Sequence, residues 1–236
     1  RMKPGLDQKD SWQYMQEMLP LVQDLWRGDV AHKGRFWQFP SATSCPKPLQ
    51  QTVPMWVAAR SPITFDYAVA NDCNIMSWPL TLPFSEAVKY RTQLDEAIAK
   101  NGGTYAGRFA MMRHTSVYET ASDRQSALDA TRGVLSQFGN LIMKSGEVRN
   151  GFPDPVPLES LDGNFRVEPK MLEDNLMFGS PSQVIDKLGK YQEIGVDAFI
   201  YYASMGLGMA QQQRSLQLFI EHVMPAFNNR KSNNAR

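Results

Sequence analysis

The sequence has 236 residues, of which 42% are hydrophobic, and its 25 lysines and arginines nearly balance 24 aspartates and glutamates. This composition predicts a soluble globular protein with enough apolar side chains for one sizeable core. It contains no basic block of the kind that binds nucleic acid or a charged membrane surface, only a short polar tail over residues 228–236. No apolar run approaches the roughly 18 to 20 residues that span a bilayer. Cys45 and Cys73 lack metal-ligand or disulfide-framework spacing, which favours a reducing cytoplasm and no metal site.

The first periodic segment, Trp12 to Trp26, is predicted to be an amphipathic helix that ends at Gly28. A strand-like piece, His32 to Phe39, and a connection interrupted by prolines, Ser41 to Gln50, follow it. After them, short apolar runs alternate with helical patterns, which predicts βαβ units and a parallel sheet. The expected strands are Met55–Ala59, Asn74–Trp78, Phe109–Val117 and Ala198–Ala203, and the expected helices are Thr64–Val69, Ser85–Lys100, Ser122–Lys144, Ser182–Ile194 and Ala210–Val223.

Successive right-handed βαβ units place their strands side by side, so we expect these strands to be neighbours in sequence order, with helices over one face. Ser145 to Gly179 is a long run rich in proline, glycine and charge. A connection of this length is usually a functional lid or disordered, and the residues alone leave both possibilities open.

About four strand-helix units are too few to close a barrel, which needs eight. The chain is therefore either a small doubly wound domain or half of a larger fold. A leading helix without a preceding strand and a first residue, Arg1, that is not methionine favour the half.

Eight phrases in order resemble the bacterial-luciferase-like flavin-dependent monooxygenases, from that family's fourth helix to its C-terminus. The phrases are LWRG (Leu25–Gly28), HKGRFWQF (His32–Phe39), CPKP (Cys45–Pro48), VPMWVAARSPIT (Val53–Thr64), IMSWPL (Ile75–Leu80), FGSPSQV (Phe178–Val184), GVDAFIYY (Gly195–Tyr202) and SLQLFIEHVMPAF (Ser215–Phe227). The resemblance covers nearly the whole of residues 1–236. It implies the C-terminal half of a (β/α)8 barrel, with the N-terminal strands missing, and a lid or insertion loop over residues 145–179 at the mouth of the active site.

The resemblance also implies a function, namely oxidation of a small organic substrate by O2 and reduced FMN. An NAD(P)H flavin reductase would supply the FMN, and the whole protein would be a homodimer. FMN is favoured over a deazaflavin by the similarity to the luciferases. A fragment of this kind is expected to be inactive alone, because the family's residues nearest the reacting oxygen come largely from the first four strands. The catalytic residues and the substrate are therefore not predicted.

The best candidate site follows the strand Met55–Ala59, where a helix begins at ARSPIT. Ser61 and Thr64 lie beside the free N–H groups of a helix N-terminus, which favour an anion. Without the resemblance, a plain serine N-cap followed by proline would be the better explanation of this pattern. The family uses the corresponding turn to hold the flavin phosphate, which assigns Ala59, Arg60, Ser61 and Thr64 to it. Arg60 departs from the acidic residue of the luciferases, so its role stays open.

The resemblance places Ser77 and Trp78 in the pocket of the isoalloxazine ring, where an indole suits a planar partner. A tryptophan of the barrel core is the alternative for Trp78. Among the histidines, His32 is expected in a surface turn and His222 on an exposed helix, whereas His114 could face either the lumen or the outer helices. Alternation lets at most one of Tyr201 and Tyr202 face the lumen, and Ser204 closes this last strand.

Two alternatives remain open at this point. One is a non-catalytic flavin-binding or dimerisation flavoprotein of the same fold. The other is an unrelated α/β binding domain in which the motifs occur by coincidence.

Overall fold

The computed structural model describes residues 10–143, 147–154, 159, 163, 167–203 and 206–228. The chain divides into two compact units, Arg1–Pro54 and Met55–Arg236. The predicted polar tail lies outside the described residues from residue 229 onward.

The first unit contains α1 (Ser11–Arg27) and a hairpin of β1 (Val30–Lys33) and β2 (Gln38–Ala42). One carboxylate organises the hairpin turn, because Glu17 accepts hydrogen bonds from the backbone N–H groups of Arg35, Phe36 and Trp37. His32 also contacts this carboxylate, with 3.0 Å between Nε2 and Oε1. The expectation of a surface turn at His32 was therefore wrong: the residue lies in β1, where Glu17 is its partner.

The second unit is built on a parallel sheet whose strands follow the predicted order. Strand β3 (Trp56–Ala58) pairs with β4 (Asn74–Ser77), β4 with β5 (Phe109–Val117), and β5 with β9 (Ala198–Ala203). Among the described residues, β3 and β9 each pair on one side only. The sheet is therefore open, as expected for part of a barrel.

A fifth strand, β8 (Met177–Gly179), was not predicted, and it pairs with the C-terminal end of β5. Met111 pairs with both Ser77 of β4 and Phe199 of β9, and Thr115 pairs with residues of both β8 and β9. Because a strand has two edges, β4 and β8 lie one after the other along one edge of β5, and β9 occupies the other.

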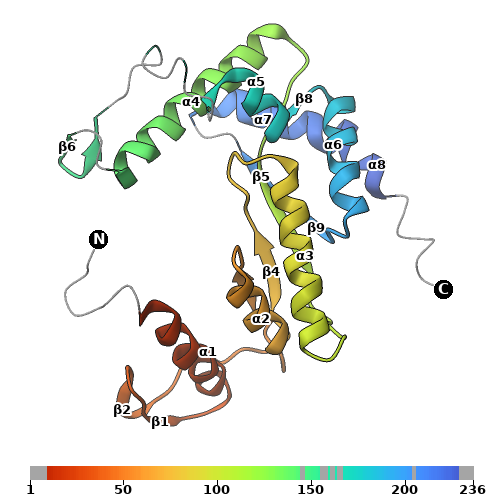
Figure 1. The fold of residues 1–236 in the computed structure, drawn as a ribbon. Coiled ribbons are helices and arrows are strands. Elements are labelled where there is room, and N and C mark those ends of the chain that lie inside the picture. The colour runs from red at the N-terminus through yellow and green to blue at the C-terminus, as the bar shows by residue number, and fades with distance from the viewer. Residues whose placement is uncertain are drawn as a thin grey trace. The chain divides into compact units, whose positions relative to one another are not determined.

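The helices confirm the predicted pattern to within a few residues. They are α2 (Pro62–Ala70), α3 (Phe84–Lys100), α4 (Ala121–Met143), α6 (Pro181–Glu193) and α7 (Met209–Leu218), continued by the π-helical turn η4 (Phe219–Val223) and α8 (Pro225–Asn228). Helix α3 lies alongside α2 and β4 (Figure 1), and the rings of Phe65, Tyr90 and Phe109 meet between α2, α3 and β5. In the described part of the chain, no helix is both long and apolar enough to cross a membrane.

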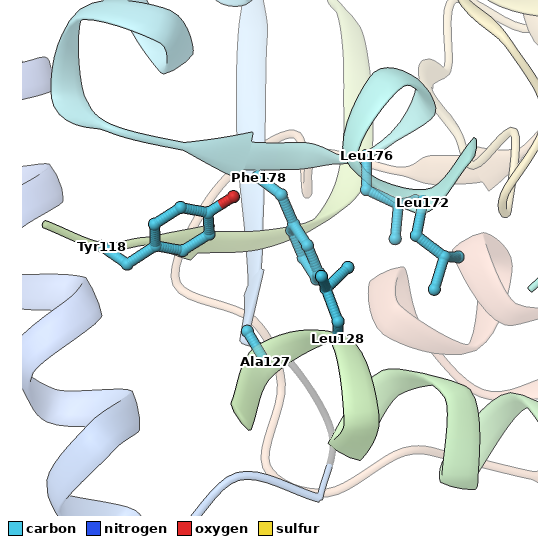
Figure 2. Packing of buried hydrophobic residues seen from close by; sticks show 6 residues of the cluster. All are labelled: Tyr118, Ala127, Leu128, Leu172, Leu176 and Phe178. Atoms are coloured by element: carbon cyan, nitrogen blue, oxygen red, sulfur yellow. The ribbon is translucent and has the colours of Figure 1, made fainter. Parts of the chain in front are cut away.

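The run predicted as a single long connection, residues 145–179, contains regular structure where it is described. It includes a short antiparallel pair, β6 (Val148–Arg149) with β7 (Phe152–Pro153), then α5 (Pro169–Asn175) and β8. Figure 2 shows side chains of α5 and β8 packed towards α4 and the end of β5. This cluster consists of Tyr118, Ala127, Leu128, Leu172, Leu176 and Phe178.

Polar contacts reinforce the same junction. Arg124 of α4 donates two hydrogen bonds to the carboxylate of Glu173 in α5, each 2.5 Å long. The hydroxyl of Tyr118 donates a third, 2.8 Å long. Lys187 of α6 donates to the backbone carbonyls of Glu173, Leu176 and Phe178. The C-terminal part of the predicted lid, which consists of α5 and β8, is thus held against the sheet and its helices.

The two faces of the sheet differ, and the helix contacts identify them. The ring of Phe109 packs on Phe65 of α2, Arg113 binds Tyr191 of α6, and Tyr201 binds Ser215 of α7. Because neighbouring strand residues point to opposite faces, His114 and Tyr202 lie on the face turned away from these helices.

Candidate functional site

The turn after β3 has the strand-to-helix geometry that the sequence predicted. Strand β3 ends at Ala58, Ser61 is the extended N-cap residue of α2, and Pro62 occupies the first helical position. Proline is favoured at that position because its missing N–H would have no intrahelical partner. The turn therefore lies at the C-terminal edge of the parallel sheet.

The hydroxyl of Thr64 makes several hydrogen bonds within this turn. Its oxygen accepts hydrogen bonds from the backbone N–H groups of Arg60 and Ser61, each 3.2 Å long, and donates to the Ser61 carbonyl at 2.7 Å. Ser61 Oγ lies 3.3 Å from the same oxygen. Thr64 thus occupies the N–H groups of Arg60 and Ser61, so a phosphate bound by these two donors would share or replace that contact.

A buried hydroxyl aligns this turn with the end of β4. Ser77 is fully buried and donates a 2.7 Å hydrogen bond to the Ala59 carbonyl, while the Ala59 N–H donates to the Met76 carbonyl at 3.0 Å. Since β3 and β4 are parallel, the Ser61 turn and Trp78 lie at the same edge of the sheet. Through these hydrogen bonds, Ala59 and Ser77 hold the turn and the end of β4 in a fixed relative position.

Arg60 is exposed, and its guanidinium lies close enough to the hydroxyl of Tyr90 to influence the pKa of that group. Burial, the larger influence, raises the pKa of Tyr90, the neighbouring Glu86 raises it further, and the charge of Arg60 counteracts part of this rise.

Three aromatic rings meet on the face of the sheet turned away from the helices. Trp78 contacts His114 and Tyr202 edge-on, with ring centroids 5.6 and 5.5 Å apart, and His114 and Tyr202 are stacked 4.6 Å apart. The sequence left the orientation of His114 open. The structure places it with Trp78 and Tyr202, and it places Tyr201 on the opposite face, so only one tyrosine of the pair belongs to this cluster.

The aromatic cluster contains polar atoms without partners. Within the described residues, the indole N–H of Trp78 and both ring nitrogens of His114 are buried and have no hydrogen-bond partner. Such groups are costly to bury unsatisfied and are uncommon in native structures. Burial lowers the pKa of His114 to about 4, with the positive charge of Arg113 adding to the effect. At neutral pH the imidazole is therefore uncharged and has one donor and one acceptor nitrogen.

These residues suit a ligand with an anionic end and a planar end. The Ser61 turn has two hydroxyls at a helix N-terminus for an anion, and the cluster of Trp78, His114 and Tyr202 has flat apolar faces, beside which the buried nitrogens of Trp78 and His114 lack hydrogen-bond partners among the described residues. Of the other candidates, His222 is exposed on η4. Ser204 and much of residues 145–166 lie outside the described residues.

Sequence reasoning missed two residues that hold the loop after Trp78, namely Arg113 and Asn175. Arg113 donates hydrogen bonds to backbone carbonyls of this loop, as does Asn175. The lone arginine in the apolar run FAMMRHTSV was the available signal for Arg113, because a charge inside a buried strand requires specific partners. No sequence signal pointed to Asn175.

Comparison with known proteins gives one family. Residues 2–198 match the family model described as luciferase-like monooxygenase. The chain is 34% identical over 232 residues to the oxygenase component of a flavin-dependent trigonelline monooxygenase from Acinetobacter baylyi, covering 98% of this chain and 64% of that protein. It is 22% identical to an F420-dependent glucose-6-phosphate dehydrogenase from Rhodococcus hoagii, covering 92% of this chain and 61% of that one. The chain thus spans less than two thirds of the length of these relatives.

Solved structures share the fold. Monooxygenase RslO1 from Streptomyces bottropensis matches with a TM-score of 0.67 and 20% identity, covering 93% of this chain and 63% of that one. The oxygenating constituent of 3,6-diketocamphane monooxygenase from Pseudomonas putida, solved in complex with FMN, matches with a TM-score of 0.62 and 15% identity, covering 91% and 63%.

Proposed function

The chain belongs to the luciferase-like monooxygenase family, and from this premise we propose that it forms the phosphate side and one wall of the flavin pocket of a flavin-dependent monooxygenase. The observation that carries the proposal is the shared edge of the sheet. A helix N-terminus with two hydroxyls and a planar indole lie there at the ends of adjacent strands.

We propose FMN as the cofactor. The relative with 34% identity is named as flavin-dependent, and a structural neighbour was solved with FMN. The F420-dependent relatives have lower identity, 22% and 24%, which makes a deazaflavin the second choice.

In this proposal some residues bind the flavin, and others hold the binding turn in position. Ser61, Thr64 and the backbone of Arg60 bind the phosphate, and the guanidinium of Arg60 neutralises part of its charge. Ala59 and Ser77 keep this turn in register with β4. Trp78 forms one side of the ring pocket, and Tyr202 and the neutral His114 lie beside it.

The reduced flavin supplies two electrons, so that one oxygen atom of O2 enters the organic substrate and the other leaves as water. The apolar faces of Trp78 and Tyr202 exclude bulk water from this region, which limits unproductive loss of reducing equivalents. An NAD(P)H flavin reductase as partner and a homodimer of the whole protein are parts of the same proposal. The proposal also includes a lid over residues 145–179. Its final helix, α5, is anchored to α4 by the ion pair of Glu173 and Arg124.

The test is a contrast between two ligands in the intact protein. Replacing Thr64→Glu puts a negative charge where the phosphate binds, so FMN affinity should fall about ten-fold or more, the equivalent of the roughly 1.5 to 3 kcal/mol of a charge-assisted hydrogen bond. Riboflavin lacks the phosphate and should bind to the variant and to the wild type with similar affinity. Fluorescence titration measures both affinities.

Thr92→Glu is the matched control, because Thr92 is exposed on α3 and the substitution makes the same change of charge. It should leave both affinities unchanged. Equal weakening of FMN and riboflavin by Thr64→Glu in a folded protein would mean that the turn is only a helix cap. Tight FMN binding without O2-dependent turnover would support the non-catalytic flavoprotein instead.

A further inference from the structure

The loop that follows Trp78 is held by side chains at four consecutive backbone carbonyls. Arg113 Nη1 donates to the carbonyls of Leu80 and Leu82 at 3.0 and 2.8 Å, and its Nη2 donates to that of Pro83 at 3.5 Å. Asn175 Nδ2 donates to the remaining carbonyl, that of Thr81, at 2.9 Å. The loop thus has anchors from β5 and from α5.

The shape of the loop explains why it needs such anchors. The Leu82 N–H donates to the Pro79 carbonyl at 3.0 Å, which closes a tight turn. Leu80 lies at φ 57° in this turn, a left-handed conformation that is unfavourable for a residue with a Cβ. Backbone in such a conformation persists when surrounding contacts determine it. The hydrogen bond from Arg113 to the Leu80 carbonyl is one of these contacts.

Arg113 is among the largest fully buried side chains in the described part of the chain, with 0% of its surface exposed. A buried charge is costly unless its donors are satisfied. Here one donor, Nε, binds the hydroxyl of Tyr191 at 2.8 Å, and the two terminal nitrogens bind the loop. An apolar side chain would fill this space without the cost of a buried charge, so the guanidinium is explained by the carbonyls that it binds.

We infer that Arg113 and Asn175 are positioning residues for Trp78. The indole leaves the chain where β4 ends and this loop begins, and its ring rests on His114 and Tyr202. Contacts on the ring alone leave its backbone free to shift, and the anchored loop prevents this. The inference rests on the proposed function in one respect, namely that Trp78 lines the flavin pocket.

Asn175 also connects the loop after Trp78 to the segment predicted as a lid. Asn175 is the last residue of α5, the helix that follows residues 147–167, and α5 is itself fastened to α4. The hydrogen bond from Asn175 to the Thr81 carbonyl thus joins α5 to the loop that begins at Trp78.

The experiment follows the Trp78 ring directly by ¹⁹F NMR of the intact protein labelled with 5-fluorotryptophan. Trp78→Phe assigns the Trp78 resonance among those of the other tryptophans, Trp12, Trp26, Trp37 and Trp56. Without flavin, Asn175→Ala and Arg113→Met should shift or broaden the Trp78 resonance. Arg113→Lys, which keeps the charge but not the planar fork of donors, should have an intermediate effect.

Asn101→Ala is the matched control, because Asn101 also ends a helix and its amide donates to a backbone carbonyl, that of Ala97, at 2.8 Å. It should leave the Trp78 resonance in place. Asn175→Ala removes one hydrogen bond only, so it keeps the test decisive if Arg113→Met does not fold. An unmoved Trp78 resonance in Asn175→Ala would overturn the inference for Asn175, and an unmoved resonance in Arg113→Lys would overturn it for Arg113.

FMN titration of the same variants separates this inference from the proposed function. A several-fold loss of FMN affinity that accompanies the NMR change supports both. An NMR change with unaltered FMN affinity supports the positioning role and contradicts the placement of Trp78 in the flavin pocket.

Discussion

The ring of Tyr202 stacks on the imidazole of His114, with centroids 4.6 Å apart and planes inclined by 25°. The two residues are direct partners in the register of β9 and β5, so their side chains leave the sheet on the same face. Tyr202 is partly exposed, whereas His114 is 1% exposed. The tyrosine therefore helps to cover a histidine whose ring nitrogens have no hydrogen-bond partner among the described residues.

This burial predicts a pH dependence of stability. The folded protein keeps His114 neutral until the pH falls to about 4, its lowered pKa, while the unfolded chain takes up the proton near the ordinary value of 6.5. Between these values the unfolded state binds more protons, so stability decreases as the pH falls. The loss is roughly 3 kcal/mol over that window. Urea unfolding at a series of pH values measures it.

His114→Phe keeps a ring in the cluster and cannot titrate, so this part of the pH dependence should disappear. His222→Phe is the matched control, because His222 is exposed on η4, and this variant should keep the wild-type slope. Identical pH dependence in His114→Phe and the wild type would contradict the assignment.

A second prediction concerns the turn at the start of α2. Thr64→Val has the same shape but lacks the hydroxyl that bonds to Arg60, Ser61 and the Ser61 carbonyl. The loss of these contacts at a helix N-terminus should destabilise the protein by about 1 kcal/mol. Thr64→Ser keeps the hydroxyl and should recover most of this. Thermal or urea unfolding makes the comparison, and equal stabilities of the two variants would argue against the role of the hydroxyl.

A third prediction concerns the ammonium group of Lys187, which binds three backbone carbonyls at the junction of α5 and β8. Lys187→Met removes the donor and leaves these carbonyls without it, which should cost about 1.5 to 3 kcal/mol in the free energy of unfolding. Lys190→Met is the control, because Lys190 is exposed on the same helix, and its effect should stay within about 0.5 kcal/mol. Similar effects of the two substitutions would show that the carbonyl contacts add little.

The sequence by itself determined four of the five parallel strands described in the sheet, the order of these four and most of the helices between them. The apolar runs and caps are local signals, and right-handed βαβ connections leave few arrangements of such units. It also located the turn at Ser61, because proline and a following threonine mark a strand-to-helix turn within a few residues. The family resemblance rested on phrases spread along the chain, and the family match confirmed it.

Only the tertiary structure decided which residues meet. Strand β8 has three residues, too few for a periodic pattern, and its pairing with β5 gives it its structure. Alternation along β5 allowed either face for His114, and the packing of Arg113 against α6 settled the choice. The anchoring of the Trp78 loop by Asn175 joins residues 94 positions apart in the chain. A hydrogen bond between such distant residues depends on how α5 packs, and no local pattern of residues encodes that.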